Sequence, residues 1–166
     1  EELIYYSPPQ STLVYDHDER LMLAEFSAER RYLKTYDEMP QQLINAFLSI
    51  EDRRFYEHPG VDPIGIIRAA VRNLQPGRVR PQGASTITMQ LAGNAIKGID
   101  RREITMERKI QEAIKALLIE RNYTKEQIIE FYLNEILMGG MNYGVEAAAQ
   151  IVTWHLLEAK RFLGEL

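Results

Sequence analysis

A glutamate followed at once by paired arginines stands where an apolar stretch of this chain ends. Residues 40–50 (PQQLINAFLSI) repeat apolar side chains at intervals of three and four, which predicts a helix. Glu51 then lies at the negative end of the helix dipole and near aromatic residues. Both surroundings favour its protonated form, whereas Arg53 and Arg54 oppose that effect. A carboxyl so placed suits a general base or acid working near neutral pH. On this segment alone, an ordinary surface glutamate in a charged loop is the simpler interpretation.

A second segment, QGASTITMQLA at residues 82–92, has the composition of a helix start. Gly83 permits a close approach of the backbone, and Ser85 or Thr86 can cap a helix that we expect over residues 85–97. The free N–H groups of the first turn would offer a seat for an anion. A well-capped helix without a ligand explains the same residues.

A third segment carries two cations and a carboxylate on one helix, expected over residues 103–121. Arg108 and Lys109 precede Glu112 by four and three residues, so the three side chains can touch. A solvated helix face with salt bridges is the ordinary alternative. We expect the apolar stripe of this helix, on the other side, to be buried: Met106, Ile110, Ala113, Ile114 and Leu117.

Together with a fourth segment, these stretches resemble the family 51 glycosyltransferases. This family comprises the peptidoglycan glycosyltransferase domain of bifunctional penicillin-binding proteins and the monofunctional transglycosylases. Its first motif is similar to EDRRFYEHPGVD here, its second to QGASTITMQLAGN, its third to RKIQEA and its fourth to KEQIIEFYLNEILMGGMNYGVEAAAQ. Four ordered motifs over roughly residues 13–150 are far more specific than one short pattern.

The resemblance implies polymerisation of lipid II, in which the 4-hydroxyl of an acceptor GlcNAc attacks the anomeric carbon of the donor MurNAc and expels undecaprenyl pyrophosphate. It assigns Glu51 as the catalytic base and Glu112 as a second essential carboxylate. Substrate or pyrophosphate binding is expected at Arg53, Ser85, Thr86, Gln90, Asn94, Arg108 and Lys109. No metal ligands are assigned, although a divalent cation, Mg²⁺ or Mn²⁺, would suit the leaving group.

By the same resemblance, the protein works in the bacterial cell envelope, at the extracytoplasmic face of the plasma membrane. Its expected partners are lipid II, the growing glycan strand, the membrane surface and inhibitors of the moenomycin type. Residues 63–79 mix Ile, Val and Leu with Arg68, Arg72 and Arg78, as in an interfacial helix whose arginines reach lipid phosphates. A core helix with a polar outer face fits this pattern too, but the resemblance favours the membrane.

The expected fold is mainly α, a lysozyme-like helical domain with a short N-terminal β-hairpin. Residues 11–15 and 21–26 form two strands around a turn, and residues 1–36 are the hairpin and linker of the same domain. Residues 37–166 are the helical glycosyltransferase part. Its helices are expected at 40–50, 63–74, 85–97, 103–121, 125–138 and from 145 onward. The chain is expected to begin after the family's N-terminal membrane anchor and to lack the family's later helices.

Composition and charge narrow the function further. The 166 residues are 45% hydrophobic, enough for one domain with a core, and the absence of cysteine excludes disulfides and thiolate metal sites. The net charge is −4, but nine basic and three acidic residues between Arg68 and Lys109 make a band of +6. Such a band indicates an anionic ligand such as pyrophosphate or a lipid headgroup. No nucleic-acid motif accompanies it, so nucleic acid is not an expected partner.

The chain departs from the family pattern at positions where the family carries cations. Gly93 stands where Lys or Arg is usual, and Ile104 stands where Arg is common. Two alternatives to polymerisation follow: a non-catalytic module that binds lipid II, and a lysozyme-like enzyme that cleaves glycan. The basic band argues against the second alternative, because glycan hydrolysis needs no pyrophosphate site.

Overall fold

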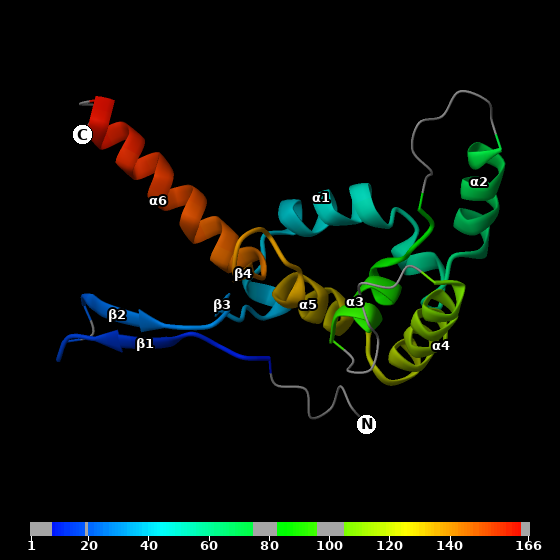
Figure 1. Cartoon of the computed structure of the whole chain (residues 1–166), viewed down its shortest axis with the longest axis horizontal. Coiled ribbons are helices and arrows are strands. Elements are labelled where there is room, and N and C mark those ends of the chain that lie inside the picture. Colours follow the sequence, from blue (N-terminus) through cyan, green and yellow to red (C-terminus); the bar gives the residue numbers. More distant parts are fainter. Residues whose placement is uncertain (1–7, 19, 75–82, 96–104, 164–166) are drawn as a thin grey trace.

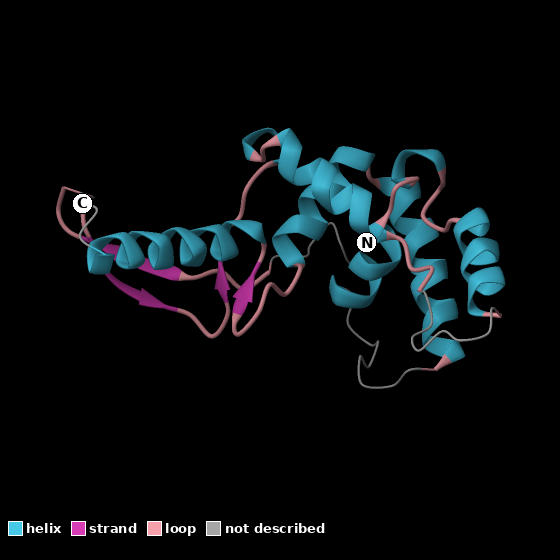
Figure 2. Ribbon diagram, turned by 90° about the horizontal axis from the view of Figure 1, so that it is seen from above, coloured by secondary structure: helices cyan, strands magenta, loops and turns pink. Residues whose placement is uncertain are grey.

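The molecule is an elongated helical protein with a small β-hairpin at one end. The computed structural model describes residues 8–18, 20–74, 83–95 and 105–163, with side chains described as far as residue 157. Three helices, α1, α3 and α5, occupy the middle of the molecule, and α2 and α4 lie at one end. Figures 1 and 2 show the hairpin of β1 and β2 at the opposite end, where α6 also projects. The expected mainly α class with an N-terminal hairpin is confirmed.

The described helices begin and end close to where the sequence pattern places them. The strands are β1 (Thr12–Tyr15), β2 (Met22–Phe26), β3 (Arg30–Arg31) and β4 (Asn142–Tyr143). Short 3-10 turns are η1 (Tyr36–Glu38) and η2 (Phe55–Glu57). The helices are α1 (Gln41–Glu51), α2 (Pro63–Asn73), α3 (Ile87–Ala95), α4 (Met106–Asn122), α5 (Lys125–Glu135) and α6 (Val145–Leu163).

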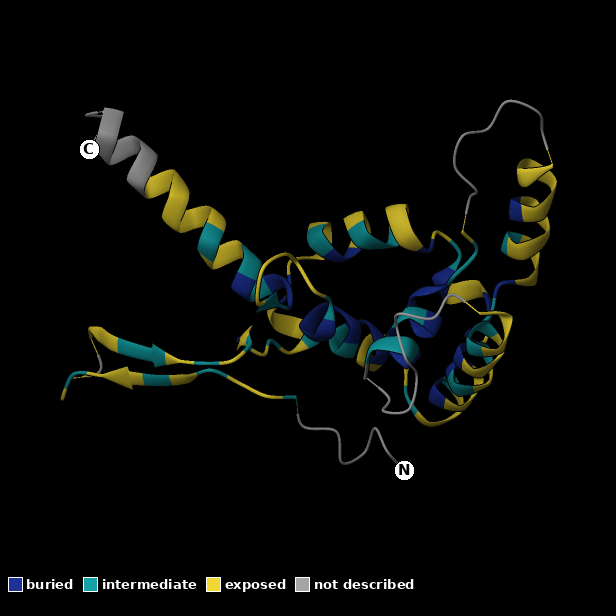
Figure 3. Ribbon diagram, in the orientation of Figure 1, coloured by how far each residue is buried: buried dark blue, intermediate teal, exposed yellow. Residues whose placement is uncertain are grey.

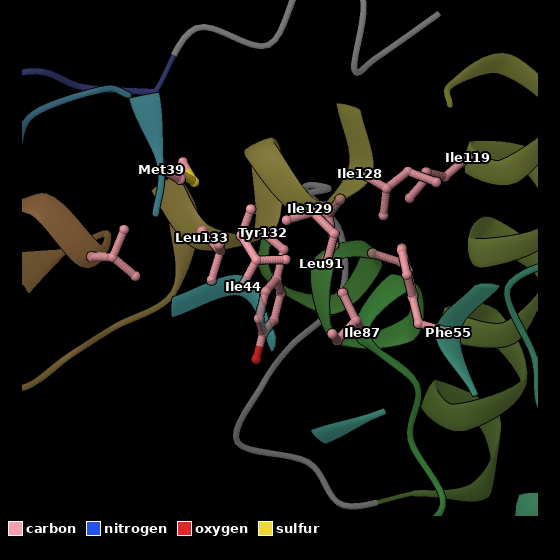
Figure 4. Packing of buried hydrophobic residues seen from close by; sticks show 12 residues of the cluster. Met39, Ile44, Phe55, Ile87, Leu91, Ile119, Ile128, Ile129, Tyr132 and Leu133 are labelled. Atoms are coloured by element: carbon pink, nitrogen blue, oxygen red, sulfur yellow. The ribbon is translucent and has the colours of Figure 1, made fainter. Parts of the chain in front are cut away.

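The core is centred on α5, which lies between α1, α3 and α4. Its start is fixed by a capping box, in which Thr124 accepts a hydrogen bond from the N–H of Gln127 and donates its own N–H to the Gln127 side chain. Figure 4 shows the aromatic and aliphatic side chains that pack around it. The buried cluster includes Ile44, Phe55, Ile87, Leu91, Ile119, Ile128, Ile129, Tyr132 and Leu133.

The C-terminal end of α5 differs from the prediction. The pattern predicted a helix to residue 138, but α5 ends at Glu135 because the next residues turn back to form β4. Gly139 and Gly140 both have positive φ and build this turn, which glycine adopts without steric cost. The two-residue parallel pair of β3 and β4 was not predicted, since strands of this length carry no periodicity to detect.

The orientation of α4 contradicts the predicted burial. Met106 and Ile110 of the expected buried stripe are 78% and 57% exposed, and Ile114 and Leu117 are exposed too, whereas Ala113 is half-buried. The buried face instead carries Glu112, Ala116 and Ile119. The prediction assumed that the apolar side of an amphipathic helix faces the protein; here α4 packs its charged side against α3.

Close contacts explain how this inverted packing is possible. A Cβ at Gly60 would lie 2.8 Å from the carbonyl oxygen of Ala116, so the loop before α2 fits against α4 only as glycine. A Cβ at Gly93 of α3 would lie 3.1 Å from Oε1 of Glu112. Small residues therefore bring both neighbours close to the charged side of α4.

Exposed apolar residues gather on α2 and α4, at the same end of the molecule (Figures 1 and 3). We call them the apolar end surface, defined by Ile64, Ile67 and Val71 of α2, Leu74 at its C-cap, and Met106, Ile110, Ile114 and Leu117 of α4. Within each helix they recur at spacings of three, four and seven, so they share one face. Over the described part of the chain, no helix is long and apolar enough to cross a bilayer. These apolar side chains are exposed among the residues that the structure describes, and exposed apolar surface of this kind marks a site of interaction.

Candidate active site

The loop after α1 is tied to the start of α3 by a buried carboxylate. Asp52 accepts hydrogen bonds from Nε2 of His58 at 3.1 Å and from the N–H of Ile87 at 3.1 Å. Nδ1 of His58 accepts the N–H of Gly60, which makes Nε2 the protonated nitrogen. Asp52 thus seats its negative charge at the positive end of α3, next to Glu51 in sequence.

Thr86 completes the capping of α3. Its hydroxyl donates to the carbonyl of Gly60 at 2.5 Å and accepts the N–H of Met89 at 3.1 Å. The start of α3 was predicted to offer N–H groups to an anion. The N–H of Ile87 already binds Asp52 and that of Met89 binds Thr86, so these two donors serve the protein's own residues. Thr86 therefore holds the helix in place.

Glu51 is the last residue of α1, and its side chain is exposed to the cleft. Its Oε2 accepts a hydrogen bond from Nε2 of Gln90 at 2.9 Å. Oε1 of Gln90 in turn accepts the hydroxyl of the buried Tyr132 at 3.2 Å. Burial, with a smaller contribution from the charge of Glu51, raises the pKa of Tyr132 above its ordinary value, so the phenol stays protonated. Gln90 was predicted to assist pyrophosphate binding, but its contacts lie beside the candidate base.

Glu112 anchors a cluster of charges between α3 and α4. Arg108 approaches Oε1 of Glu112 at 3.2 Å, and Nζ of Lys109 lies 2.6 Å from its Oε2. Lys109 also donates to the hydroxyl of Ser85 at 2.9 Å. Glu112 is buried, whereas Lys109 is 39% exposed, so the lysine presents its charge to solvent while staying paired. The predicted contact among Arg108, Lys109 and Glu112 is confirmed.

A cleft of about 260 Å³ runs between the end of α1, the inner face of α2 and residues 83–86. Glu51, Ser85 and Arg53 line it, and Nε of Arg53 also donates to the carbonyl of Ser49, at the C-terminal end of α1. The other charged residues of the lining are Asp52, Arg54, Asp62, Arg68 and Arg72. The cleft therefore combines one exposed carboxylate with several guanidinium groups, which suits an anionic substrate.

Of the three arginines predicted to reach lipid phosphates, Arg68 and Arg72 belong to α2, and Arg78 lies outside the described residues. Arg68 and Arg72 line the cleft with Gly65, whereas Ile64, Ile67 and Val71 face outward on the apolar end surface. The pattern had suggested arginines that reach lipid phosphates. One helix thus presents cations to the cleft and apolar side chains to the outside.

The structure brings the predicted site residues into two neighbouring groups. Glu51 contacts Gln90, and Glu112 contacts Arg108 and Lys109; Ser85 joins the two groups, since it lines the cleft and binds Lys109. Asn94 lies four residues after Gln90 on α3, on the same face, and is half-buried. Ile104, Lys97, Arg101 and Arg102 lie outside the described residues.

Three residues that matter for this geometry were missed by sequence reasoning: Asp52, His58 and Tyr132. Asp52 and His58 stand inside the first motif, so their position was a signal, but their mutual contact depends on the path of the loop. Tyr132 belongs to the apolar pattern of α5, where nothing distinguishes it from a packing residue. No three His, Asp or Glu side chains of the described residues could together hold a metal ion, and both oxygens of Glu112 already face cations.

Comparison with known proteins identifies the family. Residues 19–155 match the transglycosylase family. Penicillin-binding protein 1A of Aquifex aeolicus (strain VF5) is 47% identical over 146 residues, which are 88% of this chain and 19% of that protein. Penicillin-binding protein 1A of Rickettsia felis (strain ATCC VR-1525 / URRWXCal2) is 46% identical over 90% of this chain and 19% of its own length.

Penicillin-binding protein 1A of Escherichia coli (strain K12) is 47% identical over 138 residues, 83% of this chain and 16% of that protein. The chain thus spans less than a fifth of the length of these relatives. The matched region holds the cleft, Glu51 and the charge cluster around Glu112. On this extent of similarity, the chain belongs to the transglycosylase family.

Proposed function

We propose that this domain is a peptidoglycan glycosyltransferase that polymerises lipid II and releases undecaprenyl pyrophosphate. The observation that carries the proposal is the pairing of an exposed carboxylate, Glu51, with a cationic cluster that reaches the same cleft through Ser85. Glycosyl transfer from a pyrophosphate donor needs a base for the acceptor hydroxyl and positive charge for the leaving group. Membership of the transglycosylase family supports the same reaction.

In this proposal Glu51 acts as the base. Its Oε2 is held by Gln90, and no described residue bonds to Oε1, which leaves that oxygen for the acceptor hydroxyl. The hydroxyl oxygen forms a bond to the anomeric carbon of the donor as its proton passes to Glu51. The bond between that carbon and the pyrophosphate oxygen breaks, and the leaving group takes the bonding electrons.

The leaving pyrophosphate is assigned to Lys109, Arg108 and Ser85, with Asn94 on the adjacent face of α3. Lys109 can meet a phosphate oxygen without leaving Glu112, because its ammonium group has three N–H donors, and Ser85 and Glu112 use two. Glu112 fixes the direction of both cations. Arg53, which lines the cleft beside Glu51, is assigned to the substrate on the acceptor side.

We further propose that the apolar end surface rests in the outer leaflet of a bacterial plasma membrane. A substrate with a polyprenyl tail stays in the bilayer, so an enzyme that acts on its headgroup must bring the cleft to the membrane surface. The outer face of α2 is apolar while its inner face lines the cleft, which supports this orientation. Apolar side chains buried at a bilayer interface supply the binding energy.

Replacement of Glu51 by Gln tests the base. Glu51→Gln should lower polymerisation of labelled lipid II by about 10²- to 10⁴-fold, because the amide cannot accept the hydroxyl proton. Folding and donor binding should be nearly unchanged. Glu57→Gln is the control. Glu57 is exposed, pairs with Arg54 and does not itself line the cleft, so this variant should polymerise at the normal rate. A Glu51→Gln protein with substantial activity would exclude this role, and cleavage of finished glycan by the native chain would favour the hydrolase.

Replacement of Lys109 or Arg108 by Ala tests the leaving-group site. Each change should weaken binding of lipid II and of moenomycin-type inhibitors by about tenfold at low salt, and the loss should shrink as salt screens the charges. Ile110→Val, on the next position of α4, should leave affinity and salt dependence unaltered. Unchanged binding in both alanine variants would mean that the pair only stabilises the fold around Glu112.

Gly93 offers a gain-of-function test. A side chain at this position starts beside Glu112, so Gly93→Lys adds a cation to the cluster and should raise turnover and inhibitor affinity together. One added charged contact is worth on the order of 2 kcal/mol, and a need for Mg²⁺ or Mn²⁺ should fall accordingly. Gly93→Ala is the matched control, because it brings the same Cβ without charge. Equal behaviour of the two variants would show that another residue already fills the role, or that the domain only binds lipid II.

Binding to lipid vesicles tests the membrane-facing surface. Ile67→Asp and Ile114→Asp should each weaken binding to phosphatidylglycerol and phosphatidylethanolamine vesicles by about tenfold or more, since a charge replaces an apolar side chain that would be buried in the bilayer interface. Leu23→Asp, at an exposed apolar position of β2 at the other end of the molecule, is the control. If Leu23→Asp is as harmful as the other two changes, the hairpin and not the apolar end surface contacts lipid.

A further inference from the structure

A continuous hydrogen-bonded line connects the core to the candidate base. The hydroxyl of Tyr132 donates to Oε1 of Gln90 at 3.2 Å, and Nε2 of Gln90 donates to Oε2 of Glu51 at 2.9 Å. Tyr132 is fully buried, and its ring meets Phe47 edge to face. Figure 4 shows this ring among the core residues, with its hydroxyl oxygen at the edge of the cluster. The line therefore begins at a rigid point and ends at an exposed carboxylate.

The direction of this line is set by the tyrosine. Among the described residues, Oε1 of Gln90 is the only acceptor that the Tyr132 hydroxyl reaches. If the amide of Gln90 turned over, its NH₂ group would face the phenol and the phenol proton would lose its acceptor. A buried donor without an acceptor is costly, so the amide oxygen stays toward Tyr132. The NH₂ group must then face Glu51.

This fixed amide determines how the side chain of Glu51 is held. Its NH₂ group donates to Oε2 of Glu51 at 2.9 Å, and no described residue bonds to Oε1. The carboxylate is therefore oriented with Oε1 left for the acceptor hydroxyl, beside the charged groups that line the same cleft: Asp52, Arg53, Arg54, Asp62, Arg68 and Arg72.

We propose that Tyr132 is a positioning residue of the glycosyl transfer reaction: through Gln90, it keeps the base Glu51 aimed at the acceptor hydroxyl. Neither Tyr132 nor the inner part of Gln90 has to touch the substrate. This inference rests on the proposed function for its catalytic meaning, while the line of hydrogen bonds can be tested independently of turnover.

The test removes one oxygen atom. Tyr132→Phe keeps the ring and its contact with Phe47 but frees the Gln90 amide to turn over. kcat for lipid II polymerisation should fall by about tenfold, because a base that is no longer held in place takes the hydroxyl proton less efficiently. KM for lipid II and affinity for moenomycin-type inhibitors should stay the same, since the cations are untouched. An unchanged kcat would overturn the proposal.

Tyr123→Phe is the matched control. The hydroxyl of Tyr123 is also buried, but it has no hydrogen-bond partner in the described part of the structure. Its removal should leave kcat unchanged. If both phenylalanine variants lower kcat equally, the effect of Tyr132→Phe reflects core packing and the positioning role is rejected.

A second variant and a second readout keep the outcome decisive. Gln90→Met removes both hydrogen bonds at similar size, and adding Tyr132→Phe to it should cause no further loss of kcat; additive losses would reject the line. The side-chain carboxyl of Glu51 can be observed by ¹³C NMR and assigned by its loss in Glu51→Gln. At one fixed pH its signal should change position in Tyr132→Phe but not in Tyr123→Phe, and no change overturns the inference. If the native chain makes no polymer, the proposed reaction fails while this NMR comparison still decides the positioning role.

Discussion

The fold depends on the burial of one carboxylate, Glu112, between α3 and α4. A buried charge is costly unless it is paired, so α4 must carry Arg108 and Lys109 inward with it. With this side turned toward α3, the apolar residues of α4 have to face outward. The same constraint thus creates the cationic cluster that contacts Ser85 of the cleft and half of the apolar end surface. A helix that buried its apolar side would provide neither.

A second buried carboxylate locks the first two motifs together. Asp52 binds His58 and the first N–H of α3, which fixes the end of α1 against the start of α3. Glu51, one residue earlier, is consequently exposed at the cleft while its neighbour is buried. Two adjacent acids therefore differ in their surroundings: Asp52 joins the helices through its hydrogen bonds, and Glu51 is exposed at the cleft, as the proposed base has to be. Gln90 can reach Glu51 only because this anchor sets the position of α3.

The architecture places two unlike surfaces back to back on α2. Its inner face lines the cleft with Arg68 and Arg72, and its outer face is apolar. Under the proposed function, both surfaces would serve the lipid-linked substrate, since its headgroup is anionic and its tail stays in the bilayer. Gly93 stands on α3 beside Glu112, at a position where the family usually carries a cation. Both carboxylate oxygens of Glu112 are already paired, with Arg108 and Lys109.

The sequence by itself determined the family and the approximate bounds of the helices, and it supplied the candidate residues of the site. Motif order singled out Glu51, Glu112, Arg108 and Lys109 as candidates, and local signals such as the capping box at Thr124 located the start of a helix, because these depend on neighbours along the chain. Tertiary structure decided which face of α4 is buried. The sequence pattern distinguishes an apolar side from a charged side, but it does not show which of the two packs against α3. It also decided the contacts of Asp52 with Ile87 and of Gln90 with Tyr132. These residues are 35 and 42 positions apart, so only the packing of α3 on its neighbours brings them together.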